Sequence, residues 1–275
     1  MVTGAFADGT GFARLGAGGK SLLWIGGPST GAPGGLYLKM MTRMLRPFVR
    51  HGYTVWILGL KPNLPDGCTV ADMAEDYARL IVEEFGGKVD VVVGDSTGGM
   101  IGFYLSARHP EVFDHVVIAV AAYTMTEAAN AANLDSARLL SVGRKNDAAA
   151  ALLALQYPDI RPRWVTCLLA WAVARVSFAA YDAHDVLVAA EAVNGFDGRE
   201  ILPSIAVPVL LVCGDRDRFF TKEAYEETAD LIADCTLRMY PGKDHIGAMS
   251  DKRLPRDVLD FVRHPSPPVP DTARR

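Results

Sequence analysis

The sequence predicts an α/β fold, in which a mostly parallel central sheet is flanked by helices and a helical cap is inserted after the sixth strand. Short apolar runs alternate with segments of about 10–15 residues whose apolar side chains recur at helical spacing. Residues 89–93 are valines except for Asp90, a run typical of a strand covered on both sides. Half of the 275 residues are hydrophobic and 22% are charged, which indicates one folded domain and excludes disorder, collagen and coiled coil.

The first 122 residues show the alternation most regularly. A turn signal at residues 8–11 predicts a small N-terminal hairpin. Thr69 is the expected N-cap of a helix that ends at Gly86 and Gly87. In the preceding helix, at 36–49, Pro47 predicts a kink or an early end. The expected strands are 21–25, 54–60, 89–93 and 115–121, and the expected helices are 36–49, 70–85 and 100–108.

Residues 123–203 break this rhythm, because they contain helical patterns and alanine-rich stretches but no strand run. We expect them to form a cap on a core made of residues 1–122 and 204–264. Residues 265–275 contain four prolines and are expected to be disordered. After the cap, the expected elements are a strand at 207–213, a helix at 222–233, a strand at 236–240 and a helix at 252–263.

Charge and cysteine usage exclude several classes of protein. The net charge is −4, from 28 Lys and Arg against 32 Asp and Glu, so nucleic acid is not an expected partner. The four cysteines lie far apart without metal-ligand spacing, and we expect reduced thiols. The N-terminus lacks a secretory pattern, and the apolar stretch 164–173 is too short to span a bilayer. We therefore expect a cytoplasmic protein with a small-molecule partner, no membrane contact and an oligomeric state that stays open.

The pentapeptide Gly94-Asp95-Ser96-Thr97-Gly98 carries the strongest chemical signal. It matches the pattern G-x-S-x-G and lies directly between a predicted strand and a predicted helix, which is the context that the pattern requires. A serine on so tight a turn is forced into strained backbone geometry, and the flanking glycines leave room for the turn. The sequence therefore predicts that Ser96 is a nucleophile at the edge of the sheet.

A serine hydroxyl is a weak nucleophile, so it needs a base and a carboxylate that orients the base. Among the six histidines, His245 lies just after the last predicted strand, where it faces the same crevice as the serine. Asp215 and Asp217 both follow the strand at 207–213, and both are candidates on chemistry alone.

An oxyanion needs two N–H donors. Thr97 follows the nucleophile and supplies one of them. The second must come from the loop after the first parallel strand, where Pro28 has no N–H and Gly27 is therefore the predicted donor.

Over about residues 5–264, these motifs together resemble the α/β-hydrolase superfamily. The runs Gly214-x-x-Asp217 and Gly242-x-x-His245 match that family in order and spacing. Because the family acid usually falls three residues after the glycine, the resemblance implies Asp217 rather than Asp215. The family often has a histidine where this chain has Ile25, while the glycine donor is kept.

The family also places a helical cap after the sixth strand, and the side chains of the cap determine which substrate is bound. Trp164, Leu168 and Trp171 fall on one helical stripe and are candidate substrate contacts. Tyr123, where the last strand before the cap ends, is another candidate. The alternative is that the stripe packs the cap against the core.

The resemblance implies a serine hydrolase that uses no cofactor or metal and cleaves a carboxylic ester or lactone through an acyl-enzyme. A cap rich in Ala, Leu and Trp favours a bulky, mostly apolar substrate, of which a macrocyclic lactone is one example. The alternatives are a C–C bond hydrolase, an amidase or a perhydrolase that uses the same three residues, or a non-hydrolytic receptor on the same scaffold.

Overall fold

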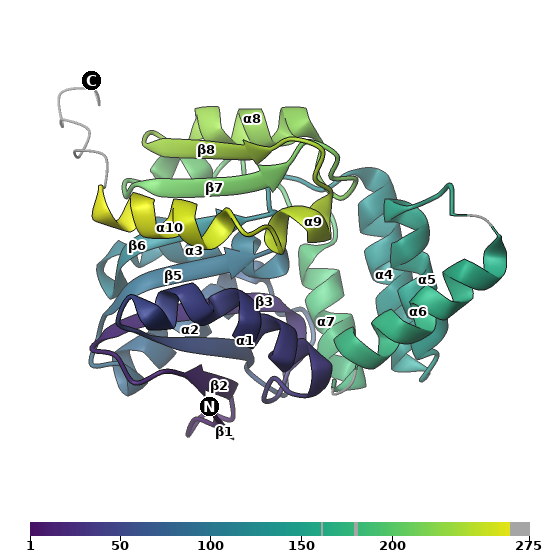
Figure 1. Ribbon diagram of the computed structural model, residues 1–275, viewed down its shortest axis with the longest axis horizontal. Helices are drawn as coiled ribbons and strands as arrows, with labels where there is room; N and C mark the ends of the chain where they lie inside the picture. Colours follow the sequence, from purple (N-terminus) through teal and green to yellow (C-terminus); the bar gives the residue numbers. More distant parts are fainter. Residues whose placement is uncertain (161, 179–180, 265–275) are drawn as a thin grey trace.

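A single sheet runs through the core of the molecule. The computed structural model describes residues 1–160, 162–178 and 181–264, and its eight strands have the order β1-β2-β4-β3-β5-β6-β7-β8 (Figure 1). The β1–β2 and β2–β4 pairs are antiparallel, and the other neighbouring strands are parallel, which confirms the predicted fold class. The strands are β1 (Val2–Ala5), β2 (Gly11–Leu15), β3 (Lys20–Thr30), β4 (Tyr53–Leu60), β5 (Val89–Asp95), β6 (Phe113–Ala119), β7 (Val209–Gly214) and β8 (Cys235–Tyr240).

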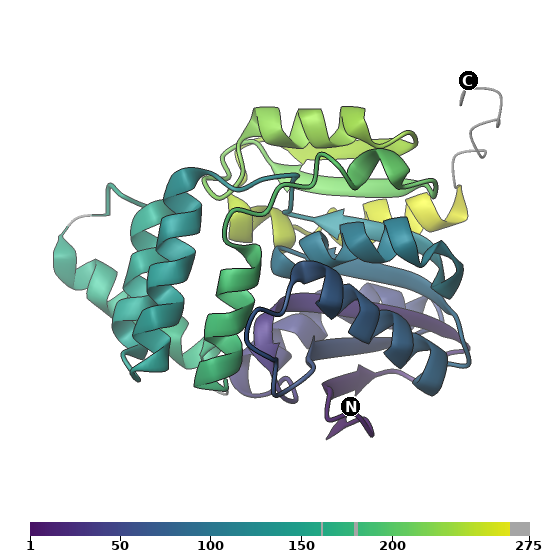
Figure 2. The same cartoon turned by 180° about the vertical axis from the view of Figure 1, so that it is seen from behind.

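Helices cover both faces of the sheet. One group of helices lies on the face toward the viewer in Figure 1, and a second group covers the opposite face, seen in Figure 2. The first group is α1 (Gly35–Arg50) and α10 (Leu254–Arg263), and the second is α2 (Val70–Glu84), α3 (Thr97–Arg108) and α8 (Lys222–Leu231). Short helical segments are η1 (Pro110–Val112), η2 (Leu202–Ser204) and α9 (His245–Met249).

The first half of β3 has no polar face because helices cover it on both sides. Leu22 and Trp24 pack with the residues of α1 and α10, whereas Leu23 and Ile25 pack with those of α2 and α3. All four side chains have no exposed surface. Alternation along the strand therefore places every apolar side chain in one of two cores.

The helix α1 differs from the sequence prediction. It continues past Pro47 to Arg50, so of the two expected effects of Pro47 the early end is wrong, and the kink stays a prediction. Pro47 lies in the last turn, where the missing N–H removes only one hydrogen bond near the helix end. The helical spacing of Leu36, Met40, Met44, Leu45 and Phe48 in the sequence predicts one buried apolar stripe. That prediction is partly wrong, because Leu36 and Met40 are more than half exposed. The buried face consists of Leu38, Met41, Leu45 and Phe48.

Short sequence signals at both ends of α2 predict where the helix begins and ends. Thr69 accepts a hydrogen bond from the N–H of Asp72, whose carboxylate accepts one from Thr69 in return, and this capping box starts the helix. Gly86 and Gly87 follow its end with φ of +69° and +95°. The prediction of a Thr69 cap and a Gly-Gly terminator is confirmed.

Four helices lie between β6 and β7, beyond the carboxyl ends of the parallel strands (Figure 1). They are α4 (Glu127–Ser141), α5 (Lys145–Gln156), α6 (Arg163–Ser177) and α7 (Ala183–Val193). This agrees with the expected helical insertion, whose boundaries at residues 123 and 203 stay a prediction. The tail at 265–275 lies outside the described residues. Among the helices that are described, none has both the length and the apolar character needed to cross a bilayer.

Asp185 attaches α7 to the loop that follows β4. Its carboxylate is 1% exposed and accepts hydrogen bonds from the N–H groups of Asn63 and Leu64, at 3.1 and 2.7 Å. His184 Nε2 lies 2.9 Å from the carbonyl oxygen of Leu64. The carboxylate thus binds two backbone donors that no strand or helix satisfies, and one of them, the N–H of Leu64, is buried.

We expect Asp185→Ala to lower the free energy of unfolding by about 2–4 kcal/mol, because it leaves both N–H groups without an acceptor. Asp182→Ala, which removes the N-cap of the same helix, is expected to cost only about 1 kcal/mol. Urea denaturation of the two variants measures the difference. Equal losses would mean that Asp185 contributes no more than an ordinary cap.

Candidate active site

Ser96 lies on a sharp turn between β5 and α3, with φ of +53° and ψ of −117°. This left-handed backbone is strained for a residue with a side chain. A Cβ on Gly94 would lie 2.2 Å from the carbonyl oxygen of Gly98, and one on Gly98 would lie 2.0 Å from that of Ile25. Both glycines are therefore required by close backbone packing. Ser96 is partly exposed, while residues 91–95 and 97–100 around it are buried.

The structure brings Ser96, His245 and Asp217 together from three separate segments. His245 Nε2 lies 3.2 Å from Ser96 Oγ, and His245 Nδ1 lies 2.8 Å from Asp217 Oδ2. The imidazole thus joins the hydroxyl to the carboxylate through its two nitrogens. His245 and Asp217 are 6% and 9% exposed, so water screens their interaction weakly.

Four donors compensate the buried charge of Asp217. Besides His245, these are the hydroxyl of Tyr225 at 2.7 Å and the backbone N–H groups of Phe219 and Phe220 at 2.8 and 3.4 Å. Burial, and then the charge of Asp217, raise the pKa of Tyr225 well above its usual range. The phenol therefore stays protonated and donates a hydrogen bond to the carboxylate. Tyr225 lies on α8 outside any motif, so no sequence pattern marks its contact with Asp217.

The neighbouring carboxylate, Asp215, has a different partner. Its Oδ1 accepts a hydrogen bond from the N–H of Gly242 at 2.6 Å, and Arg216 donates its N–H to the carbonyl oxygen of Lys243 at 2.9 Å. A Cβ on Gly214 would lie 2.2 Å from that same carbonyl oxygen. Asp215 therefore ties the loop after β7 to the loop after β8, and Asp217 reaches the imidazole.

Aromatic rings hold the imidazole of His245 in place. The ring centroids of Phe219 and Phe220 lie 4.6 and 6.0 Å from that of His245. Asp244, the residue before it, caps α9 and also accepts a hydrogen bond from the hydroxyl of Tyr157 at 2.6 Å. No sequence motif marked these contacts.

The other histidines with described ring contacts bond elsewhere: His51 to Pro47 O, His109 to Glu75, His115 to Asp90 O and His184 to Leu64 O.

The two predicted oxyanion donors lie on neighbouring segments. Thr97 is the first residue of α3, and the close contact of Gly98 with Ile25 packs this turn against the end of β3. The pairing of β3 with β4 shifts register between Ile25 and Thr30, so the strand is irregular around Gly27 before it pairs again at Thr30. A Cβ on Gly27 would meet no atom within 4 Å, so the space beside it is open. The donor roles of Gly27 and Thr97 stay a prediction.

Asp95, inside the serine motif, is a further buried carboxylate for which the sequence predicted no role. It is 5% exposed, and the indole N–H of Trp24 donates to its Oδ2. Burial raises the pKa of Asp95 to about 6, against the opposing effects of that hydrogen bond and of His245. Its position next to Ser96 was the one signal available in the sequence.

The predicted cap contacts lie apart from this cluster in the described residues. Trp164, Leu168 and Trp171 form an exposed face of α6, with 66%, 57% and 46% of their surfaces accessible. Tyr123 is buried, and its hydroxyl accepts a hydrogen bond from Arg199 at 2.6 Å while the guanidinium lies over its ring. Their roles as substrate contacts stay a prediction.

The cap does reach the site through the end of α5. Gln156 is 7% exposed and its Nε2 donates to the carbonyl oxygen of Arg216 at 3.4 Å, beside Asp217. Tyr157 bonds Asp244, beside His245, as described above. Both loops that carry the site are thus in contact with the cap.

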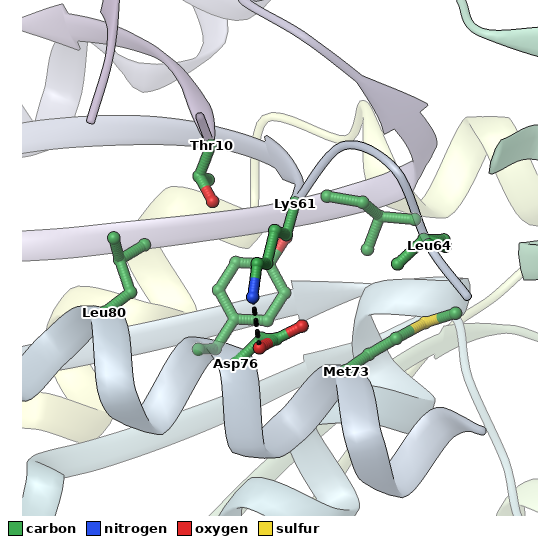
Figure 3. Close-up of a pocket in the computed structure, with 8 residues that line it drawn as sticks. Thr10, Lys61, Leu64, Met73, Asp76 and Leu80 are labelled. Atoms are coloured by element: carbon green, nitrogen blue, oxygen red, sulfur yellow. Dashed lines mark hydrogen bonds and ion pairs between the residues drawn. The ribbon is translucent and has the colours of Figure 1, made fainter. Parts of the chain in front are cut away.

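The pocket in Figure 3 is a separate feature of the molecule. It lies between β4 and α2, holds about 10 Å³ and is crossed by the ion pair of Lys61 and Asp76 at 3.1 Å. That volume is about the space for one water molecule, and none of the candidate site residues lines it. Over the described part of the chain, no three His, Cys, Asp or Glu side chains are arranged to hold a metal ion.

Comparisons with known proteins agree with the fold. The sequence profile of the family described as the alpha/beta hydrolase fold matches residues 30–252. The chain is similar in structure to an enol-lactonase from Burkholderia xenovorans LB400, with a TM-score of 0.73, 19% identity and coverage of 95% of this chain and 100% of that one. It is also similar to an esterase from Exiguobacterium antarcticum, with a TM-score of 0.71, 18% identity and coverage of 94% and 97%. At these identities the similarity concerns the fold.

Among curated proteins, the chain is similar to putative carbamate hydrolases RutD. It is 26% identical over 173 residues to that of Yersinia enterocolitica (serotype O:8 / biotype 1B), covering 62% of this chain and 61% of the relative. It is 36% identical over 58 residues to that of Serratia proteamaculans (strain 568), covering 21% of each chain. The chain therefore spans less than two thirds of either relative.

The contact of Gly98 with the β3 backbone gives a test of the site geometry. We expect Gly98→Ala to lower the free energy of unfolding by roughly 1–3 kcal/mol, because the new methyl group meets the Ile25 carbonyl and the backbone must move. Gly27→Ala is the matched control on the facing loop, where the added methyl group meets open space. Urea denaturation compares the two, and an equally stable Gly98→Ala protein would contradict the described packing.

Proposed function

The chain belongs to the alpha/beta hydrolase fold family, and from this premise we propose that it is a serine hydrolase that cleaves a carboxylic ester or lactone. The observation that carries the proposal is the position of His245, whose two nitrogens lie within hydrogen-bond distance of Ser96 Oγ and Asp217 Oδ2. A hydroxyl, an imidazole and a buried carboxylate in this order are the groups that nucleophilic acyl transfer uses.

In the first half of the reaction, Ser96 Oγ attacks the carbonyl carbon while His245 Nε2 takes the hydroxyl proton. Asp217 keeps the Nδ1 proton of His245 directed away from the serine and stabilises the imidazolium as it forms. The imidazolium then gives its proton to the departing alcohol oxygen, which remains attached to the acyl chain when the substrate is a lactone. The product of this half is an ester of Ser96.

The negative charge on the carbonyl oxygen needs donors that are fixed before the reaction. In the proposal, the N–H groups of Gly27 and Thr97 hold this oxygen. The close packing of α3 on the end of β3 supports that assignment, since it keeps both segments rigid. A water molecule, activated by the neutral imidazole of His245, then cleaves the acyl-enzyme.

The substrate class is inferred from the relatives and from the composition of the cap. Esterases and an enol-lactonase share the fold, and the curated relatives are named as putative carbamate hydrolases, so a carbamate belongs among the substrates to be tried. A cap rich in Ala, Leu and Trp favours a bulky, mostly apolar acyl or alcohol group. Ester or lactone cleavage is our first choice because it requires only the groups assigned above.

The first test is a panel of p-nitrophenyl esters of rising chain length, lactones, carbamates and peptide amides, run on the wild-type protein and on Ser96→Ala. We expect ester or lactone turnover to fall by at least about 10³-fold in the variant, with an unchanged unfolding curve. Turnover that persists in carefully purified Ser96→Ala would exclude the serine mechanism. A wild-type protein that binds these compounds without cleaving them would favour a receptor.

The second test separates the two aspartates. Asp217→Asn should lower kcat by about 10²–10⁴-fold, because the imidazole loses its anion and can adopt the wrong tautomer. Asp215→Asn weakens the bond to Gly242, so it is expected to affect stability far more than kcat. Steady-state kinetics with the best ester of the panel, beside urea denaturation, distinguishes them. The reverse ranking would assign the acid to Asp215.

A further inference from the structure

The outer side of the cap helix α6 carries an exposed apolar stripe. Trp164, Leu168 and Trp171 recur at helical spacing, and Arg175 follows one turn later on the same side. Between 46% and 66% of each of the three apolar residues is accessible to solvent. The other side of the helix packs on α5 through alanines. Contiguous exposed apolar surface of this kind marks interaction sites in proteins.

The helix α1 extends this surface. It begins after β3, at the edge of the sheet where the cap lies, and it is in contact with α6 (Figure 1). Its outward side starts with Leu36 and Met40, which are 55% and 54% exposed, and it also carries the exposed cations Lys39 and Arg43. These four residues and the four on the stripe of α6 are called the α6–α1 face below.

The two helices of this face carry only positive charge. Together α1 and α6 contain six Lys and Arg and no Asp or Glu, although the whole chain has a net charge of −4. The guanidinium of Arg175 lies over the Trp171 ring, 4.4 Å from its centroid, so a cation and apolar surface are presented together. The partner that fits such a face is apolar and anionic.

A surface groove of about 580 Å³ opens beside Trp171. Its lining includes three cations: Arg144 and Lys145 at the start of α5, and Arg175 on α6. Arg144 pairs with Asp147 at 2.8 Å, and Lys145 donates one of its three N–H groups to a backbone carbonyl. The other donors of these cations stay available to oxygen atoms of a ligand. The groove therefore has the size and the charge to take a phosphate-bearing headgroup next to the apolar stripe.

We propose that the α6–α1 face binds the surface of a bilayer that contains anionic phospholipid. Its indole rings lie in the interfacial region, which tryptophan favours, and its cations lie at the phosphate groups. The expectation of no membrane contact rested on the lack of a spanning segment, but a helix with Trp and Leu beside basic residues can lie on a bilayer without crossing it. A second copy of the chain fits less well, because a symmetric contact would bring like charges together.

The main test is co-sedimentation with vesicles of phosphatidylcholine alone and of phosphatidylcholine with about 30% phosphatidylglycerol. We expect the wild-type protein to bind the mixed vesicles at least about 10-fold more tightly, and to lose this preference as salt screens the charges. The fluorescence of Trp164 and Trp171 should shift to shorter wavelengths on binding, because both rings leave water. A protein that binds neither vesicle, or binds both equally, would overturn the proposal.

A matched pair of double variants locates the binding surface. Leu168→Ser with Arg175→Gln removes one apolar side chain and one cation from the face. Val82→Ser with Arg79→Gln does the same on α2, on the opposite side of the sheet, where Val82 is 55% exposed and the Arg79 side chain 56%. We expect the first pair to weaken binding to mixed vesicles about 10- to 100-fold, and the second to change it less than about twofold. Equal losses would overturn the proposal. Urea denaturation should show both proteins folded, since all four side chains lie at the surface.

Cys167 provides a reporter on the face itself, because it precedes Leu168 and is exposed. Cys213 is buried, and burial, followed by nearby carboxylates, raises the pKa of Cys68 and Cys235 to about 11 and 12, so these three thiols should react slowly. A nitrobenzoxadiazole dye on Cys167 should brighten when mixed vesicles are added, and Cys167→Ser should take up almost no dye. A dye that stays dim while the protein sediments with the vesicles would assign the binding to another surface and overturn the proposal.

None of these measurements uses turnover, so the proposal can fail or succeed whether or not the protein is a serine hydrolase. Sedimentation velocity without lipid tests the competing occupant. We expect a monomer at the concentrations used for vesicle binding. A dimer that dissociates in Leu168→Ser with Arg175→Gln would assign the face to a second copy of this chain and overturn the proposal.

Discussion

The close contact between the first turn of α3 and the end of β3 is the constraint on which the site depends. At Gly98 a single methyl group would collide with the Ile25 carbonyl, so the two backbones touch without a side chain between them. This contact brings the residue after Ser96 beside the loop that contains Gly27. It also forces Ser96 into its left-handed turn, because the chain must reverse from strand to helix within a few residues. This one backbone contact thus fixes the position of Ser96 relative to Gly27 and Thr97, the two candidate donors.

The other half of the site depends on a second backbone contact. Gly214 touches the carbonyl of Lys243, and Asp215 holds Gly242, so the loops after β7 and β8 behave as one unit. Asp217 and His245 therefore reach Ser96 together. Gln156 connects α5 to the same unit through its hydrogen bond to the carbonyl of Arg216.

Strain and buried charge are concentrated where the chemistry is proposed. Ser96 and Val120 have φ of +53° and +48° although neither is glycine, and Ser96 donates its N–H to the residue before Val120. A β-branched residue rarely adopts this region, so Val120 reports a real deformation at the end of β6. The strained backbone of Val120 and the burial of Asp95 both cost stability at the carboxyl ends of β5 and β6. The two apolar cores on either face of the sheet support these strand ends.

The sequence by itself determined the parallel sheet, the position of Ser96 and the cap of α2, because these follow from short-range patterns: a valine run, two glycines around a serine, and Thr69 three residues before Asp72. It also pointed to His245 and to a carboxylate after β7, since a loop at a strand's carboxyl end faces the same edge. Chemistry alone left Asp215 and Asp217 open, and only the spacing of the resembling family favoured Asp217. In the structure the two side chains differ in whether they meet the Gly242 backbone or the imidazole. Contacts between distant segments, such as Tyr225 with Asp217, Trp24 with Asp95 and Asp185 with Leu64, exist only once the sheet has assembled. Tertiary structure decided these, because a buried polar group finds its partner in space and leaves no period or motif along the chain.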